Sequence, residues 1–226
     1  MPRQAEPPGL ALGIFGYSGR LGSAITASAA QAGIPVSLRA NRQGITSTSA
    51  PTVVVDASSR DGALAAMDYC LRHELPLLEL VSSLDDADLA RLRRLAEVRA
   101  VVRAVNLARL HPAQLQLAET LARLAAPLEA EVTVLERHPA TKADRPSGTA
   151  RRLSEVLGVG GRPVNVESTR YGCPVSDHAV VLAAGHETLS ITHSVFSLGG
   201  VAARCLELAR RLPLQPPGLW TVADLE

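Results

Sequence analysis

The feature that most constrains the fold of this chain is a set of glycines between a strand-like segment and a helix-like segment. The sequence GIFGYSGRLG begins inside a short apolar run and continues into residues whose apolar side chains recur at helical spacing. Gly16, Gly19 and Gly22 allow a tight turn whose backbone amides approach a pyrophosphate at a helix N-terminus, and Arg20 adds positive charge there. The pattern predicts a dinucleotide-binding turn; the alternative left open is a tight turn without a ligand.

Two periodicities alternate along the first half of the chain. Short apolar segments with the length of buried strands occupy residues 10–15, 35–40, 52–58, 76–81 and 100–105. Segments with helical spacing separate most of them, at residues 20–32, 61–73 and 85–97. Strands that alternate with helices predict an α/β fold with a parallel sheet and right-handed crossovers. Residues 41–51 are too few and too polar for a helix, so we expect a loop there.

The pattern changes after residue 105. We expect a helix at 109–125, a strand at 130–138, a helix at 150–158, a strand at 162–168, a hairpin at 177–197 that turns at Ala184-Gly185-His186, and a helix at 199–212. The last helix is expected to return to the first domain. The sequence therefore predicts a Rossmann-type dinucleotide-binding domain, residues 1–105 completed by 200–226, and a smaller α+β domain, residues 106–199, for substrate binding and oligomerisation.

The overall composition narrows the range of partners. A net charge of +1 and only 3% aromatic residues argue against a nucleic-acid or membrane partner. Cys70, Cys173 and Cys205 have no disulfide or metal-site spacing, and no His, Asp and Glu grouping has metal-ligand spacing, so we expect no metal. The sequence has neither a leader-like segment nor an apolar run of membrane-spanning length, which predicts a cytoplasmic protein.

The charge near the second strand bears on the choice of cofactor. Dinucleotide-binding folds that use NAD place an acidic residue at the end of this strand, where it bonds the ribose hydroxyls. Here no acidic residue occurs between Glu6 and Asp56, and the strand end offers Arg39 and Arg42. A guanidinium binds a 2′-phosphate that a carboxylate would repel, so the sequence favours NADPH over NADH. The alternative is that both arginines only solvate a loop.

One lysine stands among 23 basic residues, the rest being arginine. It is Lys142, in the stretch TKADRPSGTA. Arginine keeps its proton in proteins, whereas a lysine amine can release one. Ser147 and Thr149 mark a helix start, which binds anions through free amides and hydroxyls, and His138 precedes Lys142 by four residues. The segment predicts a carboxylate-binding and proton-transfer site; the alternative is a capped helix with a solvated lysine and a surface histidine.

Several segments together resemble one enzyme family. ERHPATKADRPSGTA resembles the signature E-x-H-H-x-x-K-x-D-x-P-S-G-T-A of dihydrodipicolinate reductases. GYSGRLG is similar to their G-x-x-G-R-M-G loop, VVVDASS to V-x-I-D-F-T-x-P, and RAVNLA to A-x-N-F-S. STRYG and the hairpin that follows resemble the R-x-G, G-x-H and L-x-H-x-A-x-S motifs. The order of the motifs agrees from residue 10 to about residue 210, so the resemblance covers nearly the whole chain.

The resemblance implies an NAD(P)H-dependent homotetrameric reductase that acts on 4-hydroxy-tetrahydrodipicolinate, a small dicarboxylate, in lysine and diaminopimelate synthesis. It implies catalytic roles for His138 and Lys142. Lys142 also joins Ser147, Gly148 and Thr149 in binding a substrate carboxylate. The residues expected at the cofactor are Gly16, Tyr17, Ser18, Gly19, Arg20, Leu21, Arg39, Arg42, Ser58, Ser82, Ala104 and Asn106.

Some positions depart from the family pattern. Pro139 replaces the second histidine of the signature, which removes a substrate contact, and LVSS at residues 80–83 replaces a G-T-T-G loop. Ala57 and Ala108 replace a phenylalanine and a serine. Two alternatives follow. One is a related reductase of another cyclic imine dicarboxylate, and the other is a non-catalytic NADP-binding sensor that keeps the fold.

Overall fold

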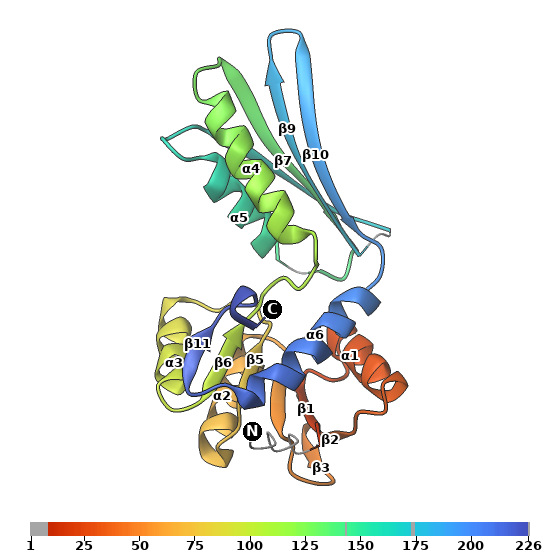
Figure 1. Ribbon diagram of the computed structural model, residues 1–226. Coiled ribbons are helices and arrows are strands. Elements are labelled where there is room, and N and C mark those ends of the chain that lie inside the picture. Colours follow the sequence, from red (N-terminus) through yellow and green to blue (C-terminus); the bar gives the residue numbers. More distant parts are fainter. Residues whose placement is uncertain (1–8, 143, 173–174, 226) are drawn as a thin grey trace, which may run out of the picture. The chain divides into compact units, whose positions relative to one another are not determined.

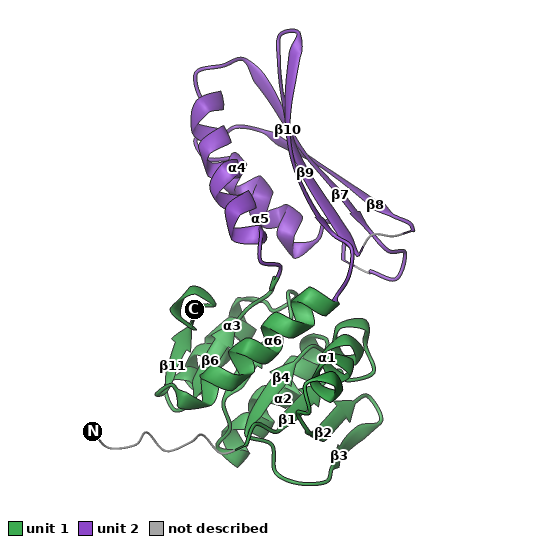
Figure 2. Ribbon diagram, turned by 45° about the vertical axis from the view of Figure 1, so that its right-hand side comes forward, with its two compact units in different colours: residues 1–107, 199–226 green, residues 108–198 purple. Residues whose placement is uncertain are grey.

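The computed structural model describes residues 9–142, 144–172 and 175–225 of the 226-residue chain. The chain forms two compact units (Figure 2), one of residues 1–107 with 199–226 and the other of residues 108–198. These divisions lie within two residues of the domain boundaries expected from the sequence, while the roles given to the two domains stay predictions. Each unit has its own sheet, and in the described residues no helix is long and apolar enough to cross a membrane.

The first unit is built on a seven-stranded sheet in the order β11-β6-β5-β4-β1-β2-β3 (Figure 1). The strands are β1 (Leu12–Phe15), β2 (Val36–Asn41), β3 (Gly44–Ser47), β4 (Val53–Asp56), β5 (Leu77–Glu79), β6 (Ala100–Arg103) and β11 (Gly218–Trp220). All pairings are parallel except that of β2 with β3. Because β1 pairs with both β2 and β4, the strand order reverses there, and ligands of such sheets bind beyond the carboxyl ends of the strands at that point.

Helices cover both faces of this sheet. Helices α1 (Arg20–Gln31) and α6 (Gly199–Arg211) enclose one aliphatic core, and α2 (Arg60–His73) and α3 (Asp86–Ala96) enclose the other. Two short 3-10 helices, Leu212–Leu214 and Ala223–Leu225, follow α6. The predicted α/β fold is thereby confirmed, and α6 makes the expected return to the first unit.

Two strands of the first unit were not expected. Residues 41–51 contain β3, which forms an antiparallel hairpin with β2, so the prediction of a loop throughout was wrong. The polar composition misleads here because all four residues of this edge strand are exposed. Asn41 accepts a hydrogen bond from the amide of Gln43 at 2.8 Å, which stabilises the turn. Strand β11 lies between two prolines and a 3-10 helix. Its three residues are too few to show the alternating pattern of a strand.

The second unit is a four-stranded mixed sheet with two helices. Its strands, in the order β10-β9-β7-β8, are β7 (Ala130–His138), β8 (Val164–Arg170), β9 (Ser176–Ala184) and β10 (Glu187–Val195). Helices α4 (His111–Ala125) and α5 (Gly148–Leu157) pack with Val132, Val134, Val180 and Leu182 into one core. Glu136, His138 and His178 lie on this same helix-covered side, because the strands alternate and Glu136 is paired with His178.

Candidate active site

The glycine loop of the first unit has a geometry that only glycine allows. Gly16 has φ +74°, and a Cβ there would lie 2.6 Å from the carbonyl oxygen of Ala57. A Cβ on Gly22 would lie 2.1 Å from the carbonyl oxygen of Gly16. The loop is therefore pressed between the start of α1 and the segment after β4, and no described side chain caps the first turn of α1. Such a bare helix start beside a close-packed backbone fits a bound pyrophosphate.

A cleft of about 840 Å³ opens beside this loop at the point where the strand order reverses. Among the residues expected at a cofactor, Gly16, Ser18, Gly19, Arg42 and Ser58 line it. The other lining residues include Asn41, Gln43, Gly44, Ile45, Ser59 and Asp61, which sequence reasoning missed. Most of these belong to the β2–β3 hairpin, which could have been found only by recognising the edge strand. The cleft and its glycine cradle fit the adenine side and phosphates of a dinucleotide.

Other residues expected at the cofactor are not part of this lining. Ala40 lines the cleft. Arg39, its neighbour in β2, is exposed and points to the other face of the strand, away from the cleft. Arg20 is the exposed first residue of α1. The remaining members of this group are Tyr17 and Leu21 in the glycine loop, Ser82 after β5, and Ala104 and Asn106 after β6. The structure thus separates Arg42 from Arg39 as the arginine at the cleft.

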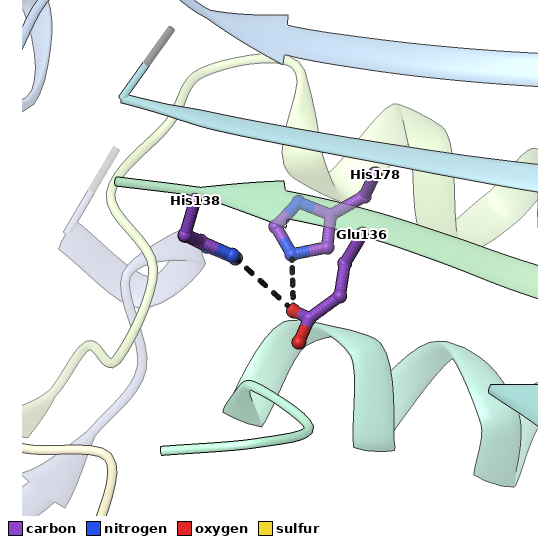
Figure 3. A group of neighbouring side chains, drawn as sticks. All are labelled: Glu136, His138 and His178. Carbon is purple, nitrogen blue, oxygen red and sulfur yellow. Dashed lines mark ion pairs between the residues drawn. The ribbon is translucent and has the colours of Figure 1, made fainter. Parts of the chain in front are cut away.

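In the second unit, a buried carboxylate lies between two histidines (Figure 3). Oε2 of Glu136 is 3.3 Å from Nδ1 of His138 and 3.6 Å from Nε2 of His178. The two rings meet edge to face with centroids 5.0 Å apart. All three side chains are buried. Glu136 and His178 were missed as site residues, since their proximity depends on the pairing of β7 with β9.

The other oxygen of Glu136 organises the surrounding loops. Oε1 accepts hydrogen bonds from the backbone amide of Ser147 at 3.0 Å, from Oγ of Ser168 at 2.6 Å and from Nη2 of Arg170 at 2.9 Å. Burial raises the pKa of this carboxyl group, but hydrogen bonds from these groups and the nearby His178 outweigh burial and hold the pKa well below its usual range. Glu136 is therefore an anion at neutral pH.

Arg170 and Asp144 fix the loop that carries Lys142. Nε of Arg170 donates to the carbonyl oxygen of Lys142 at 3.3 Å, and its Nη2 also donates to the carbonyl oxygen of Asp144. Nζ of Lys142 lies 2.8 Å from Oδ1 of Asp144, and the Lys142 side chain is one-fifth exposed. The lysine thus stands at the edge of the buried cluster with its ammonium within reach of a ligand.

Ser147 caps helix α5 with its hydroxyl oxygen. Oγ accepts a hydrogen bond from the amide of Ala150 at 3.2 Å and lies 3.1 Å from Nε2 of His178. Gly148 and Thr149 form the first turn of the helix and are partly exposed. The same histidine therefore contacts both the helix cap and Glu136, which joins the predicted anion-binding helix start to the predicted proton-transfer residues.

His138 is held neutral at physiological pH. Burial, followed by the neighbouring His178, lowers the pKa of His138 to about 4, although Glu136 opposes the shift. A neutral imidazole accepts a proton or a hydrogen bond through one nitrogen and donates through the other. The cluster offers a proton acceptor at His138 beside the ammonium group of Lys142.

The same three side chains could also bind a metal ion by their geometry. The ligand atoms of Glu136, His138 and His178 all lie within 4.8 Å of one another, and two histidines with a carboxylate are ligands that zinc accepts. The expectation of no metal rested on spacing along the chain, which cannot show contacts between β7 and β9. However, Arg170 already neutralises the carboxylate. The cluster consequently fits a proton network better than a cation site.

Comparisons with known proteins agree with this architecture. A family model described as the C-terminus of dihydrodipicolinate reductase matches residues 113–225. The 4-hydroxy-tetrahydrodipicolinate reductase of Thermosipho africanus is 27% identical over 213 residues, which cover 94% of this chain and 96% of that protein. The 4-hydroxy-tetrahydrodipicolinate reductase of Thermomicrobium roseum is 32% identical over 197 residues, covering 76% and 74% of the two chains.

Solved structures show the same fold. A dipicolinate-bound dihydrodipicolinate reductase from Paenisporosarcina sp. TG-14 has a TM-score of 0.63 at 14% identity, covering 94% of this chain and 97% of that one. An amine dehydrogenase from Mycobacterium smegmatis has a TM-score of 0.62 at 13% identity, covering 97% and 96%. Reductases and dehydrogenases of this kind imply a nicotinamide cofactor, in agreement with the glycine loop. The chain is an oxidoreductase and belongs to the dihydrodipicolinate reductase family.

Proposed function

We propose that this chain reduces 4-hydroxy-tetrahydrodipicolinate to tetrahydrodipicolinate in the cytoplasm, as a step of lysine and diaminopimelate biosynthesis. The names of its relatives support the reaction. The observation that carries the proposal is the cluster around Glu136. It joins His138, the loop of Lys142 and the capped start of α5 at Ser147.

The reaction adds a hydride and a proton to the substrate and releases its hydroxyl group as water. A bound nicotinamide cofactor supplies the hydride. Lys142 supplies the proton and its charge attracts a substrate carboxylate, which the amides at Gly148 and Thr149 bind at the start of α5. His138, whose Nδ1 lies 3.3 Å from Oε2 of Glu136, is neutral and acts as the acceptor that orients the substrate or receives a proton.

The test of this proposal is consumption of NADPH with freshly generated 4-hydroxy-tetrahydrodipicolinate. Lys142→Ala should lower kcat by about 100-fold or more, because both a proton donor and a positive charge are lost. Lys142→Arg is the matched variant: it keeps the charge but not the transferable proton, so it should bind substrate and turn over slowly. Wild-type turnover that survives in Lys142→Ala would refute the role of this lysine.

We further propose that the chain prefers NADPH to NADH, although both cofactors fit the cleft. Arg42 lines the cleft at the end of β2, where it can bind a 2′-phosphate. Arg42→Ala should weaken NADPH binding by about 10-fold or more and leave NADH binding nearly unchanged, since a hydrogen-bonded charge pair is lost only with NADPH. Arg39→Ala is the control, because Arg39 projects from the opposite face of β2. An equal effect of both substitutions would reject the assignment.

Pro139 favours a second candidate within the same chemistry. This residue removes one imidazole of the family signature, while His178 already lies against His138. The second candidate is a reductase of another cyclic imine dicarboxylate. Tight NADPH binding with no turnover of 4-hydroxy-tetrahydrodipicolinate would favour it if related cyclic imines are reduced. If none is reduced, a non-catalytic NADP-binding sensor becomes the better description.

We also propose that the chain assembles as a homotetramer through the second sheet. Helices α4 and α5 lie on one side of this sheet, and the described elements of the second unit leave its other side uncovered (Figure 1). That side carries Leu135, Ala179, Val181 and Thr192, a mixture of small, apolar and hydroxyl side chains. Light scattering should give four times the chain mass, and a monomer would contradict the proposal.

A further inference from the structure

The first unit has a buried acidic pair of its own, Asp56 and Glu79. Asp56 ends β4, Glu79 ends β5, and the two residues are register partners in the parallel sheet. Their side chains therefore project to the same face from strands about 4.8 Å apart. Neither residue has any exposed surface. Two carboxyl groups thus meet in the interior at the carboxyl end of the sheet, where the cofactor cleft opens.

Each carboxyl group fixes the start of the loop that follows its strand. Oδ1 of Asp56 accepts a hydrogen bond from the amide of Ser58 at 3.0 Å and another from the Ser58 hydroxyl. Oε1 of Glu79 accepts one from the amide of Val81 at 2.6 Å. The second oxygen of each group, Oδ2 of Asp56 and Oε2 of Glu79, is buried and forms no hydrogen bond to the described residues.

The charges around the pair do not balance two carboxylates. Arg103 of β6 is the register partner of Glu79 and is half-buried, and the Cys70 thiol of α2 is the other titratable group nearby. Burial raises the pKa of this thiol far above its usual range, so it adds no charge. Two ionised carboxylates at contact distance in a dry interior repel strongly, and such pairs retain one proton.

We propose that Glu79 is a positioning residue of the cofactor cleft: it stays neutral and donates its proton to Asp56, which ties the loop after β4 to the loop after β5. The inference rests on the proposed function only in assigning a nicotinamide cofactor to the cleft. Ser58 and Ser59 line that cleft. The Ala57–Ser58 backbone is also the part of the chain that a Cβ on Gly16 would strike. A displacement after β4 therefore reaches the glycine loop directly.

The proposal predicts an alkaline limit to cofactor binding. Burial, together with the charge of Asp56, raises the pKa of Glu79 to about 9, so the shared proton is present at neutral pH. Loss of this proton at higher pH creates a second buried charge and pushes the two loops apart. Because one proton controls binding, the affinity should fall about tenfold for each pH unit above this pKa.

The experiment is calorimetric titration of the full chain with NADPH from about pH 7 to about pH 10. Glu79→Gln keeps a hydrogen-bond donor to Asp56 and an acceptor for Val81 but cannot ionise, so its affinity should stay level where the wild-type affinity falls. Glu79→Leu removes the bond and should weaken binding throughout the range. Glu155→Gln, a surface change in the other unit, controls for general alkaline effects and should follow the wild type.

Two results would overturn the proposal. One is an identical alkaline fall in wild type and Glu79→Gln. The other is weak binding by Glu79→Gln at neutral pH, which would mean that Glu79 works as an anion paired with Arg103. Infrared spectroscopy gives a readout that needs no cofactor: the carbonyl stretch of a protonated carboxyl group should be present at neutral pH in wild type and lost in Glu79→Gln. Its absence refutes the shared proton, whereas its presence without NADPH binding refutes the proposed function instead.

Discussion

At the scale of single residues, Glu136 connects more of the second unit than any residue of the lysine loop does. Its carboxylate contacts two imidazoles, a guanidinium and the amide at the start of α5. Glu136 and Arg170 are both almost completely buried. Removing one partner from such a pair leaves the other charge uncompensated in the interior, which is costly.

Glu136→Gln tests this role because it keeps the size of the side chain and removes its charge. We expect a loss of about 3 kcal/mol in the free energy of unfolding, since Arg170 is left buried without its partner. The turnover rate should fall as well, because His138 loses the buried anion that lies 3.3 Å from its Nδ1. Urea denaturation and steady-state kinetics measure the two effects. Glu155→Gln breaks an exposed pair with Arg152 and should change stability by less than about 1 kcal/mol.

The site residues expected from the sequence are those that depend on local order along the chain, and their roles stay predictions. Lys142, Ser147 and the helix start lie within a few residues of one another, and their chemistry can be read from their spacing. His178 is 40 residues from His138 and reaches it only through the pairing of β7 with β9. Arg170 likewise depends on the pairing of β8 with β7. A single sequence contains no signal for strand register of this kind, so the carboxylate at the centre was missed.

At the scale of secondary-structure elements, the turn from β1 to α1 depends on the absence of side chains. The start of α1 approaches the glycine loop so closely that a methyl group at Gly22 would overlap the carbonyl oxygen of Gly16. This approach directs the first amides of the helix to the cleft. The close contact, rather than the sequence of the helix itself, sets the geometry of the phosphate site.

Gly22→Ala should therefore move the helix away from the loop. We expect a loss of about 1–3 kcal/mol in stability from overpacking, together with weaker binding of NADPH and NADH alike. Gly200→Ala is a matched control in α6, where a Cβ meets nothing within 4 Å. That change should stabilise the chain by about 0.5–1 kcal/mol, because alanine favours the helix. Thermal denaturation and cofactor titration of both variants check the contrast, which fails if Gly22→Ala binds like wild type.

Elements with a clear period were predicted well. Strand β7 was predicted at its observed bounds, and the helices at 109–125 and 150–158 differ from α4 and α5 by two residues or fewer at either end. The strands that were missed, β3 and β11, are short edge strands of the first sheet. Each is held by a neighbouring strand on one side only. The side chains of β3 are all exposed, and β11 has only three residues, so neither periodicity nor apolarity marks these strands.

At the scale of the whole molecule, the two units carry buried titratable groups of opposite kinds. The second unit holds neutral histidines: burial lowers the pKa of both His111 and His138 to about 4. The first unit holds acids whose pKa values burial raises, to about 9 for Glu79 and also upward for Asp56. The histidines make the free energy of unfolding decrease as the pH falls, and the buried acids make it decrease as the pH rises.

These opposite signs predict that the second unit is the less stable one at acid pH and the first unit the less stable one at alkaline pH. Between pH 6.5 and about 4, His111 and His138 are protonated in the unfolded chain but not in the folded unit. The second unit therefore loses stability as the pH falls. Between pH 4.5 and about 9, the folded first unit keeps a proton at Glu79 that the unfolded chain releases, so this unit loses stability as pH rises. Each unit has its own core, which permits separate unfolding.

Hydrogen exchange read by mass spectrometry, corrected for the intrinsic effect of pH, can follow both units at once. Peptides of β7, β9 and α4 should lose protection first at about pH 5, and peptides of β4, β5 and α2 first at about pH 9. Glu79→Gln should remove the alkaline loss in the first unit and leave the acid loss in the second unaltered. His111→Asn should reduce the acid loss, because His138 still titrates, and leave the alkaline loss unaltered. If both units lose protection together at either pH, or if the order is the same at both, the opposing titrations do not govern stability.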